Sequence, residues 1–328
     1  MEDFRLSVLD LVPVSSDSTA GNALRASHDL ARAAEVLGYH RYWVAEHHSM
    51  PGIASSAPAV LIASLAQVTS TIRLGSGGVM LPNHAPLVVA EQFGMLSAMH
   101  PGRIDLGLGR APGTDQVTAS ALRRTANLSA EDFPREFGEL IAFLDGSFPA
   151  DHPYRRIHAV PAGRPDIWLL GSSGYSAQMA GAMGLPFAFA HHFSGQHTDV
   201  AVELYRSSFR PSDVLDRPYV IVTAAAVCAD TAEEAQRLAA PMGLAMLQLR
   251  RGTPGPLPTP DEALAHPYTP LERATIAGIT EFHLIGDQAD VRRGLTELRE
   301  RTQADELMIS SNIGDPKARL RSYELMAS

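Results

Sequence analysis

Short apolar or β-branched runs alternate along this chain with longer stretches in which apolar residues recur every three or four positions. The short runs predict eight β-strands, over residues 6–12, 40–45, 72–80, 103–108, 166–170, 186–190, 219–228 and 306–310. The longer stretches predict helices over residues 20–37, 56–68, 86–99, 130–144, 173–183, 198–208, 231–250, 289–302 and 316–326. Strands separated by helices pair in parallel with right-handed crossovers. The pattern therefore predicts an α/β fold with a parallel sheet.

Eight β/α alternations in one chain are what a closed (β/α)8 TIM barrel requires, and we take residues 1–328 as a single domain of this kind. Two segments look inserted: residues 113–129 after the fourth strand, and residues 252–277 before the eighth. The second segment carries six prolines, so we expect no regular structure there before its last few residues. The alternative fold is an open doubly wound sheet. It is disfavoured because the turn after the first strand, residues 13–19, lacks the glycines of a dinucleotide-binding fingerprint.

Composition and charge exclude several classes of function. The 27 Lys and Arg residues against 36 Asp and Glu give a formal charge of −9, which argues against binding to nucleic acid or to anionic lipid. Lys317 is the only lysine, so a Walker phosphate loop is absent. Cys228 is the only cysteine, so no disulfide forms within the chain. No secretory pattern and no long apolar run are found, which predicts a cytoplasmic protein without membrane contact.

The candidate chemistry lies where the predicted strands end, the side on which barrels of this type carry their reactive groups. Residues 171–176 form a turn rich in glycine and serine that opens a helix, so backbone N–H groups and hydroxyls could hold a phosphate. The alternative is that Ser172 or Ser173 merely caps the helix. Arg110 ends the fourth strand and could reach the same phosphate. A salt bridge at the rim is its alternative.

Two pairs of adjacent histidines, 47–48 and 191–192, raise the question of a metal site. Successive residues of a strand point to opposite faces, so each pair can offer one ring to the barrel mouth. We therefore expect no metal site. The alternative for each histidine is a hydrogen-bonded rim residue without a chemical role. Glu46 could orient a neighbouring ring.

Three segments with chemistry at the strand ends, residues 42–48, 72–84 and 101–115, together resemble the bacterial luciferase-like flavin-dependent monooxygenases. Residues 171–173 and 305–309 fit the same family, in which the single-chain luciferase-like oxidoreductases are the most similar subgroup. The resemblance implies a (β/α)8 barrel that binds reduced FMN at its C-terminal rim. Gly109 stands where the luciferase α-chain carries a reactive cysteine, so light emission from a long-chain aldehyde is not implied.

The resemblance also assigns roles to individual residues. Arg110, Ser173 and Ser176 would hold the FMN phosphate, within the turn that Gly171 and Ser172 begin. Gly77 and Gly78 would lie under the isoalloxazine and be joined by a cis peptide bond. His47 matches the active-site histidine of the family and is the residue we expect to handle a proton.

The implied activity is that of an FMN-dependent monooxygenase, in which reduced flavin and O2 form a flavin C4a-peroxide that oxygenates a small organic substrate. No nicotinamide-binding turn is evident, so we expect a separate flavin reductase to supply the reduced FMN. Two alternatives stay open: a deazaflavin-dependent hydride-transfer oxidoreductase, and a non-catalytic flavin-binding protein. The family also implies a homodimer formed through the helices over residues 56–68 and 86–99. The substrate is not encoded in any motif that we can interpret.

Overall fold

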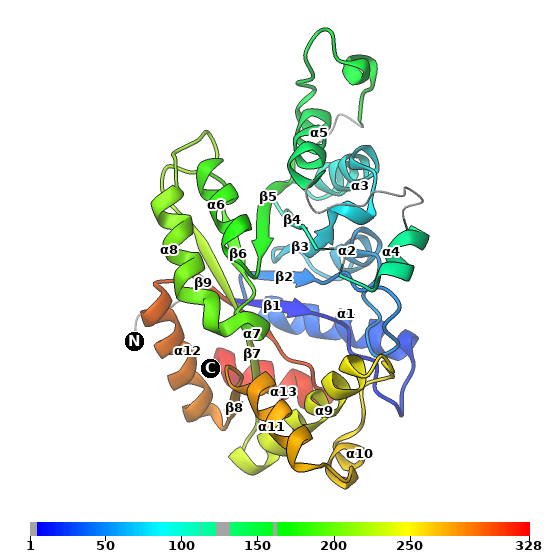
Figure 1. Ribbon diagram of the computed structural model, residues 1–328, viewed down its shortest axis with the longest axis vertical. Coiled ribbons are helices and arrows are strands. Elements are labelled where there is room, and N and C mark those ends of the chain that lie inside the picture. Colours follow the sequence, from blue (N-terminus) through cyan, green and yellow to red (C-terminus); the bar gives the residue numbers. More distant parts are fainter. Residues whose placement is uncertain (1–4, 112, 123–131, 160–162) are drawn as a thin grey trace.

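The strands form a closed parallel barrel, as the alternation predicts. The computed structural model describes residues 5–111, 113–122, 132–159 and 163–328. Each strand pairs with its neighbours in parallel, and the pairing of β6 with β7 closes the ring (Figure 1). The eight strands of the barrel are β1 (Arg5–Asp10), β2 (Arg41–Val44), β3 (Arg73–Met80), β4 (Ile104–Gly109), β5 (Asp166–Gly171), β6 (Phe187–Phe189), β7 (Val220–Cys228) and β9 (Glu306–Ser310).

Helices surround the barrel and bury their apolar faces against its outer surface (Figure 1). This arrangement confirms the (β/α)8 TIM barrel. The longer helices are α1 (Ala20–Val36), α2 (Pro58–Ala66), α3 (Pro86–Met99), α5 (Phe133–Asp145), α6 (Gly174–Ala182), α8 (Thr198–Ser208), α9 (Ala232–Arg250), α11 (Pro270–Thr280), α12 (Gln288–Thr302) and α13 (Pro316–Ala327). The shorter ones are α4 (Gln116–Leu122), α7 (His191–Ser194) and α10 (Pro260–Ala265).

Toward the N-terminal ends of the strands, the barrel interior is filled with aromatic rings and a buried ion network. Trp43 and Trp168 pack edge to face, with their ring centroids 5.3 Å apart. Beneath them, Arg41 forms ion pairs of 2.9 Å with Asp105 and with Glu306, and all three side chains are buried. Paired and hydrogen-bonded in this way, the charges are tolerated inside the barrel. These side chains therefore fill the interior near the N-terminal ends of the strands.

One strand was not predicted. β8 (Leu284–Gly286) pairs with residues Ala226 to Cys228 of β7, beyond the part of β7 that pairs with β9. Three residues are too few for a periodic pattern to identify a strand, and Gly286 has a low strand propensity. The structure thus has a ninth strand that extends one edge of β7 outside the closed ring.

The expectation of irregular structure over most of residues 252–277 is wrong. α10 and α11 lie in this segment, and each begins with a proline at its first position, Pro260 and Pro270. A proline is compatible with the first turn of a helix, because the N–H group it lacks has no partner there. Thr259 and Thr269 close a capping box at the start of each helix.

The other segment that looked inserted, residues 113–129, contains α4. Residues 123–129 of it, together with residues 130 and 131 of the predicted helix 130–144, lie outside the described residues. Among the described residues, no helix is long and apolar enough to cross a bilayer.

Candidate active site

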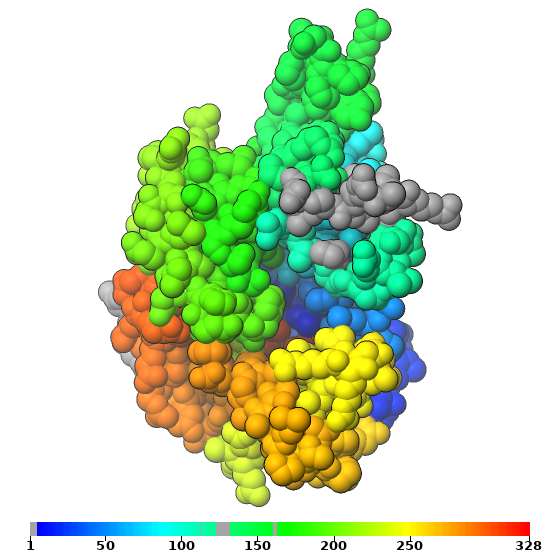
Figure 2. All heavy atoms as spheres, in the orientation of Figure 1, coloured from blue at the N-terminus to red at the C-terminus, as the bar shows by residue number. Residues whose placement is uncertain are grey.

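A cavity of about 580 Å3 opens at the C-terminal ends of the barrel strands. Figure 2 shows the surface hollowed near the centre of the view, between the green segment around α7 and the yellow segment at the end of α9. Every residue to which the resemblance assigns a cofactor-binding or catalytic role lines this cavity: His47, Gly77, Gly78, Arg110, Gly171, Ser172, Ser173 and Ser176. The structure therefore brings together the candidates from four different segments of the chain.

One end of the cavity is built for an anion. Ser173 precedes α6, but its hydroxyl accepts no hydrogen bond from the helix, so the capping alternative does not describe this residue. The first N–H groups of α6 and the serine hydroxyls thus stay available. Arg110 stacks on the ring of Tyr175 at 4.3 Å and has no carboxylate partner among the described residues. A phosphate fits this combination of a lone guanidinium and a helix N-terminus.

The backbone at Gly77 and Gly78 forms part of the cavity wall. The peptide bond between them is cis, as the resemblance predicts. A Cβ atom on Gly78 would lie 2.7 Å from the carbonyl oxygen of Gly107, and one on Gly77 would lie 2.7 Å from Leu9 Cδ1. The backbone contact at Gly78 excludes a side chain there, and a side chain at Gly77 would require Leu9 to move. Bare backbone therefore faces the cavity and leaves room for a flat ligand.

His47 follows β2 and contributes its ring to the cavity. Its backbone N–H donates to the carbonyl oxygen of Ser55 at 3.0 Å, which holds the residue in place. Its Nδ1 lies 3.4 Å from the carbonyl oxygen of Gly113, so Nδ1–H donates and Nε2 is left as an acceptor. Burial lowers the pKa of His47 below the ordinary histidine value. The ring is therefore neutral near pH 7 and able to take up a proton at Nε2.

Each histidine pair offers one ring to the cavity, as expected, although the reason differs. His47 and His192 line the cavity, whereas His48 and His191 do not. Strand alternation does not explain this, because β2 ends before His47 and the second pair lies in α7. His191 instead hydrogen-bonds Thr198 Oγ1 through Nδ1 at 2.7 Å.

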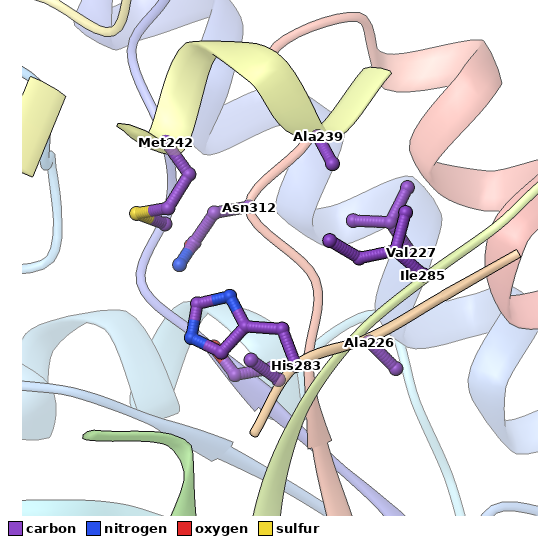
Figure 3. A pocket seen from close by; sticks show the side chains of 9 residues that line it. Ala226, Val227, Ala239, Met242, His283, Ile285 and Asn312 are labelled. Atoms are coloured by element: carbon purple, nitrogen blue, oxygen red, sulfur yellow. The ribbon is translucent and has the colours of Figure 1, made fainter. Parts of the chain in front are cut away.

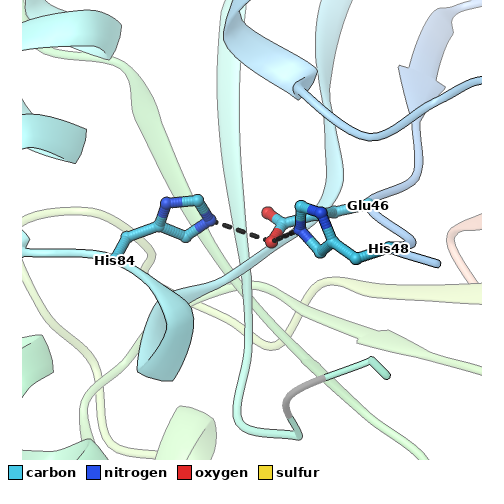
Figure 4. Close-up of side chains that lie close together, drawn as sticks. All are labelled: Glu46, His48 and His84. Carbon is cyan, nitrogen blue, oxygen red and sulfur yellow. Dashed lines mark hydrogen bonds and ion pairs between the residues drawn. The ribbon is translucent and has the colours of Figure 1, made fainter. Parts of the chain in front are cut away.

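Glu46 holds His48 and His84 beside the cavity, not His47. The Nε2 atoms of both rings lie within 2.9 Å of the same carboxylate oxygen, Glu46 Oε1 (Figure 4). The backbone N–H of Met80 donates to the other oxygen at 3.1 Å. These donors, with burial opposing them, give Glu46 a pKa below its ordinary value. The three side chains could also hold a divalent ion, since their ligand atoms lie within 4.8 Å of one another. Hydrogen bonding alone accounts for their arrangement.

Sequence reasoning missed a polar corner at the opposite end of the cavity. His283 and Asn312 point toward one another there, beneath Met242 of α9 (Figure 3). His283 immediately precedes β8, the strand that was not predicted, and Asn312 follows β9. Neither belongs to a motif. The position of Asn312 after the last strand was the only available signal.

The comparisons with known proteins agree with this geometry. The model of the luciferase-like monooxygenase family matches residues 4–306. This chain belongs to that family. Within the family, the chain is 50% identical to the protein YvbT of Bacillus subtilis, and the match covers 99% of this chain and 96% of YvbT. It is 49% identical to a luciferase-like monooxygenase of Escherichia coli, over 97% of this chain and 95% of that one. The crystal structure of apo-MsnO8 superposes with a TM-score of 0.90 at 39% identity, over 99% and 98% of the two chains.

Other relatives connect this luciferase-like monooxygenase to flavin chemistry. The chain is 34% identical to the N-acetyl-S-alkylcysteine monooxygenase of Bacillus subtilis, over 98% of this chain and 97% of that one. At 25% identity over 78% of its length, it matches the oxygenase component of a flavin-dependent trigonelline monooxygenase of Acinetobacter baylyi. More distant structures share the fold alone, among them an FMN complex of a 3,6-diketocamphane monooxygenase at 20% identity and an F420-dependent alcohol dehydrogenase at 14% identity. The chain is an oxidoreductase of a family that uses flavin-type cofactors.

Proposed function

We propose that this protein is an FMN-dependent monooxygenase that uses reduced FMN and O2 to oxygenate a small organic substrate. The observation that carries the proposal is the lone Arg110 guanidinium beside the N-terminus of α6, in the same cavity as the bare Gly77–Gly78 backbone. The first two groups suit a phosphate and the third suits a planar ring. FMN carries both.

Reduced FMN supplies the electrons that activate O2, and a route through a flavin C4a-peroxide is part of the proposal. The chain has three tasks. Arg110, Ser173 and Ser176 bind the phosphate, while Gly171 and Ser172 shape the turn. Apolar side chains, among them Met242 and Leu257, keep water from the reacting centre. His47 takes up or returns a proton at Nε2.

The proposal includes a protein partner and an assembly. The lining residues include no nicotinamide-binding turn, and the trigonelline relative is called an oxygenase component, which supports a separate flavin reductase. A homodimer through α2 and α3 is supported by four exposed apolar side chains on these helices: Val60, Val88, Met95 and Met99. Leu61 and Leu65, which could have served the same surface, are buried in the core instead.

Cofactor binding and reaction with O2 test the proposal separately. The protein is titrated with FMN and with the deazaflavin F420, and we expect FMN to bind more tightly. Rapid mixing of the complex of the protein and reduced FMN with O2 is then followed by absorbance. A transient oxygenated flavin supports a monooxygenase, and its absence points to a flavin-binding protein. Preferential binding of F420 favours hydride transfer instead.

A further inference from the structure

Three histidines, His47, His192 and His283, line the cavity, and we call this group the histidine side. Each donates one ring N–H to a backbone carbonyl oxygen. Nδ1 of His192 lies 3.3 Å from the oxygen of Thr223, and Nε2 of His283 lies 3.1 Å from the oxygen of His192. His47 does the same toward Gly113. A carbonyl can only accept, so these contacts determine the tautomer of all three rings.

The remaining nitrogen of each ring is an acceptor without a partner among the described residues. Burial lowers the pKa of all three histidines, that of His192 to about 3, so the rings are uncharged near pH 7. A neutral imidazole with one N–H already engaged offers only a lone pair. The histidine side therefore presents hydrogen-bond acceptors, and a ligand that carries hydrogen-bond donors complements them.

The rest of the lining carries no charge that could serve a substrate. Among the described lining residues, no Asp, Glu or Lys occurs, and Arg110 is the only charged side chain. An apolar wall adjoins the histidine side and consists of Met242, Met246 and Leu249 of α9 with Ile279 of α11. A charged group moved from water into such surroundings loses its hydration without gaining a partner.

Two further polar groups lie next to the histidines. Ser310 Oγ is buried and has no hydrogen-bond partner in the described part of the chain, and Asn312 lines the same corner. In Figure 3 the Asn312 side chain points toward the ring of His283. These groups can both donate and accept, so they complement a polar group that has a hydrogen to give and a lone pair to receive.

We propose that the histidine side binds an uncharged organic substrate through a hydroxyl or N–H group carried on an apolar body, and that it excludes carboxylate and ammonium groups. This inference deepens the proposed monooxygenase function and rests on it. It identifies the class of substrate that the cavity accepts.

A matched set of probes of equal heavy-atom length tests the proposal: heptanol, hexyl methyl ether and heptylammonium, with heptanoate added as the anion. Binding to the protein loaded with oxidised FMN is measured by calorimetry near pH 7. We expect heptanol to bind about tenfold or more tightly than either charged probe, which corresponds to about 1.4 kcal/mol. It should also bind several-fold more tightly than the ether, which accepts but cannot donate. Equal affinities for heptanol and heptanoate, or no binding of heptanol, overturn the proposal.

Substitutions at Asn312 provide an independent readout. Asn312→Asp places a carboxylate on the histidine side, so heptylammonium should gain about tenfold or more in affinity. Asn22→Asp adds the same charge on the exposed surface of α1 and should change nothing. Asn312→Leu should weaken heptanol more than the ether. If Asn312→Asp leaves heptylammonium binding unchanged, the polar group of the ligand is not bound in this corner and the proposal is wrong.

Failure of the proposed function would look different. FMN affinity is measured on the same preparations, and absence of FMN binding contradicts the monooxygenase proposal. The probes are then measured on the cofactor-free protein in the presence of inorganic phosphate, which occupies the Arg110 end. The preference for heptanol belongs to the histidines and Asn312, so it should persist there, and its absence contradicts this inference.

Discussion

Some arginine side chains in this protein are paired with a carboxylate, and Arg110 is not paired with one in the described part of the chain. Arg41 and Arg319 are buried and paired, Arg41 with Asp105 and Glu306, and Arg319 with Asp10 at 3.0 Å. Their charges are neutralised within the fold, so they stabilise it without being available to a ligand. Arg110 has no such partner among the described residues and faces the cavity. Its charge is available for an anion.

Replacing Arg110 should therefore affect the cofactor and not the fold. We expect Arg110→Ala to weaken FMN binding by about 1.5–3 kcal/mol, the scale of a lost charge-assisted hydrogen bond. Ser176→Ala should cost less, because a neutral hydroxyl contributes less to binding a phosphate. Fluorescence titration measures both. Arg32→Ala, which removes an exposed surface pair with Asp29, is the control. Wild-type affinity in Arg110→Ala would place the phosphate elsewhere.

His47 and His48 are neighbours with different predicted roles. His47→Ala should leave FMN binding and the melting temperature nearly unchanged while lowering oxygenation by roughly 10²–10⁴-fold, the usual contribution of a general acid or base. His48→Ala removes a donor from the buried Glu46 carboxylate, so it should lower the melting temperature with a milder effect on turnover. Product yield and thermal unfolding are measured for both variants. Equal turnover of His47→Ala and wild type would remove the catalytic assignment.

At the scale of elements, the proline-rich segment, residues 252–277, is attached to the loops that follow β1 and β2. The backbone N–H of Leu257 donates to the carbonyl oxygen of Val14 at 2.8 Å, and Ser16 donates back to Leu257 at 2.8 Å. Gly52 packs against the backbone of Gly255 and Leu257, which leaves no room for a side chain at position 52. Since Pro254, Gly255 and Leu257 line the cavity, these contacts determine how the segment closes the cavity.

Gly52→Ala should loosen this attachment. The added Cβ would lie 2.9 Å from the Gly255 oxygen and 3.1 Å from the Leu257 nitrogen, so the segment must move away. We expect trypsin to cut several-fold faster after Arg250 and Arg251, which are exposed at the start of the segment. Gly138→Ala in α5, where a Cβ meets nothing within 4 Å, is the control and should leave cleavage unchanged. Unaltered cleavage in Gly52→Ala would show that the segment is held by other contacts.

For the molecule as a whole, buried neutral histidines make stability depend on pH. Burial lowers the pKa of His191 to about 4 and that of His192 to about 3, whereas an unfolded chain binds the proton near pH 6.5. The unfolded state therefore takes up protons first as the pH falls. The contribution of these two histidines to the free energy of unfolding is fully present above about pH 6.5. It is lost as the pH decreases toward 4, by about 1–2 kcal/mol per histidine at pH 5.

Urea unfolding at a series of pH values between 7.5 and 5 measures this loss. His192→Phe keeps a ring in place and removes one titrating group, so its unfolding free energy should fall less steeply over the same range. A wild-type unfolding free energy that does not change with pH would contradict the neutral state of these rings, on which the proposed substrate class also depends.

Assembly is the second property of the whole molecule that can be tested. Light scattering should give twice the chain mass of 35.2 kDa if the protein is a homodimer. Met95→Glu places a charge on the exposed face of α3 and should reduce the mass to that of one chain. Leu271→Glu, at a side chain that is exposed on α11, is the control. A single-chain mass for the wild type would contradict the dimer.

Much of the barrel could be predicted because its evidence is local. The strand expected over residues 72–80 is β3 within one residue, and the glycine pair within it has the expected cis bond. The errors have two different causes. β8 forms through its pairing with the outer half of β7, a contact that no local pattern reveals. The error at α10 and α11 has another cause: each helix begins with local signals, a first-position proline and a capping box, which the count of prolines alone did not take into account.

The sequence by itself determined the alternation of strands and helices and the end of the barrel at which the chemistry lies, because periodicity and turn chemistry act over a few residues. Only the tertiary structure decided which ring of the second histidine pair faces the cavity and which ring nitrogen of His47 and His192 stays free. It also decided that His283 and Asn312 share a corner with them. The carbonyl oxygens that orient the rings of His47 and His192 come from residues 66 and 31 positions away in the chain. A contact over such a separation leaves no trace in the local pattern, so the character of the cavity emerges only when the barrel closes.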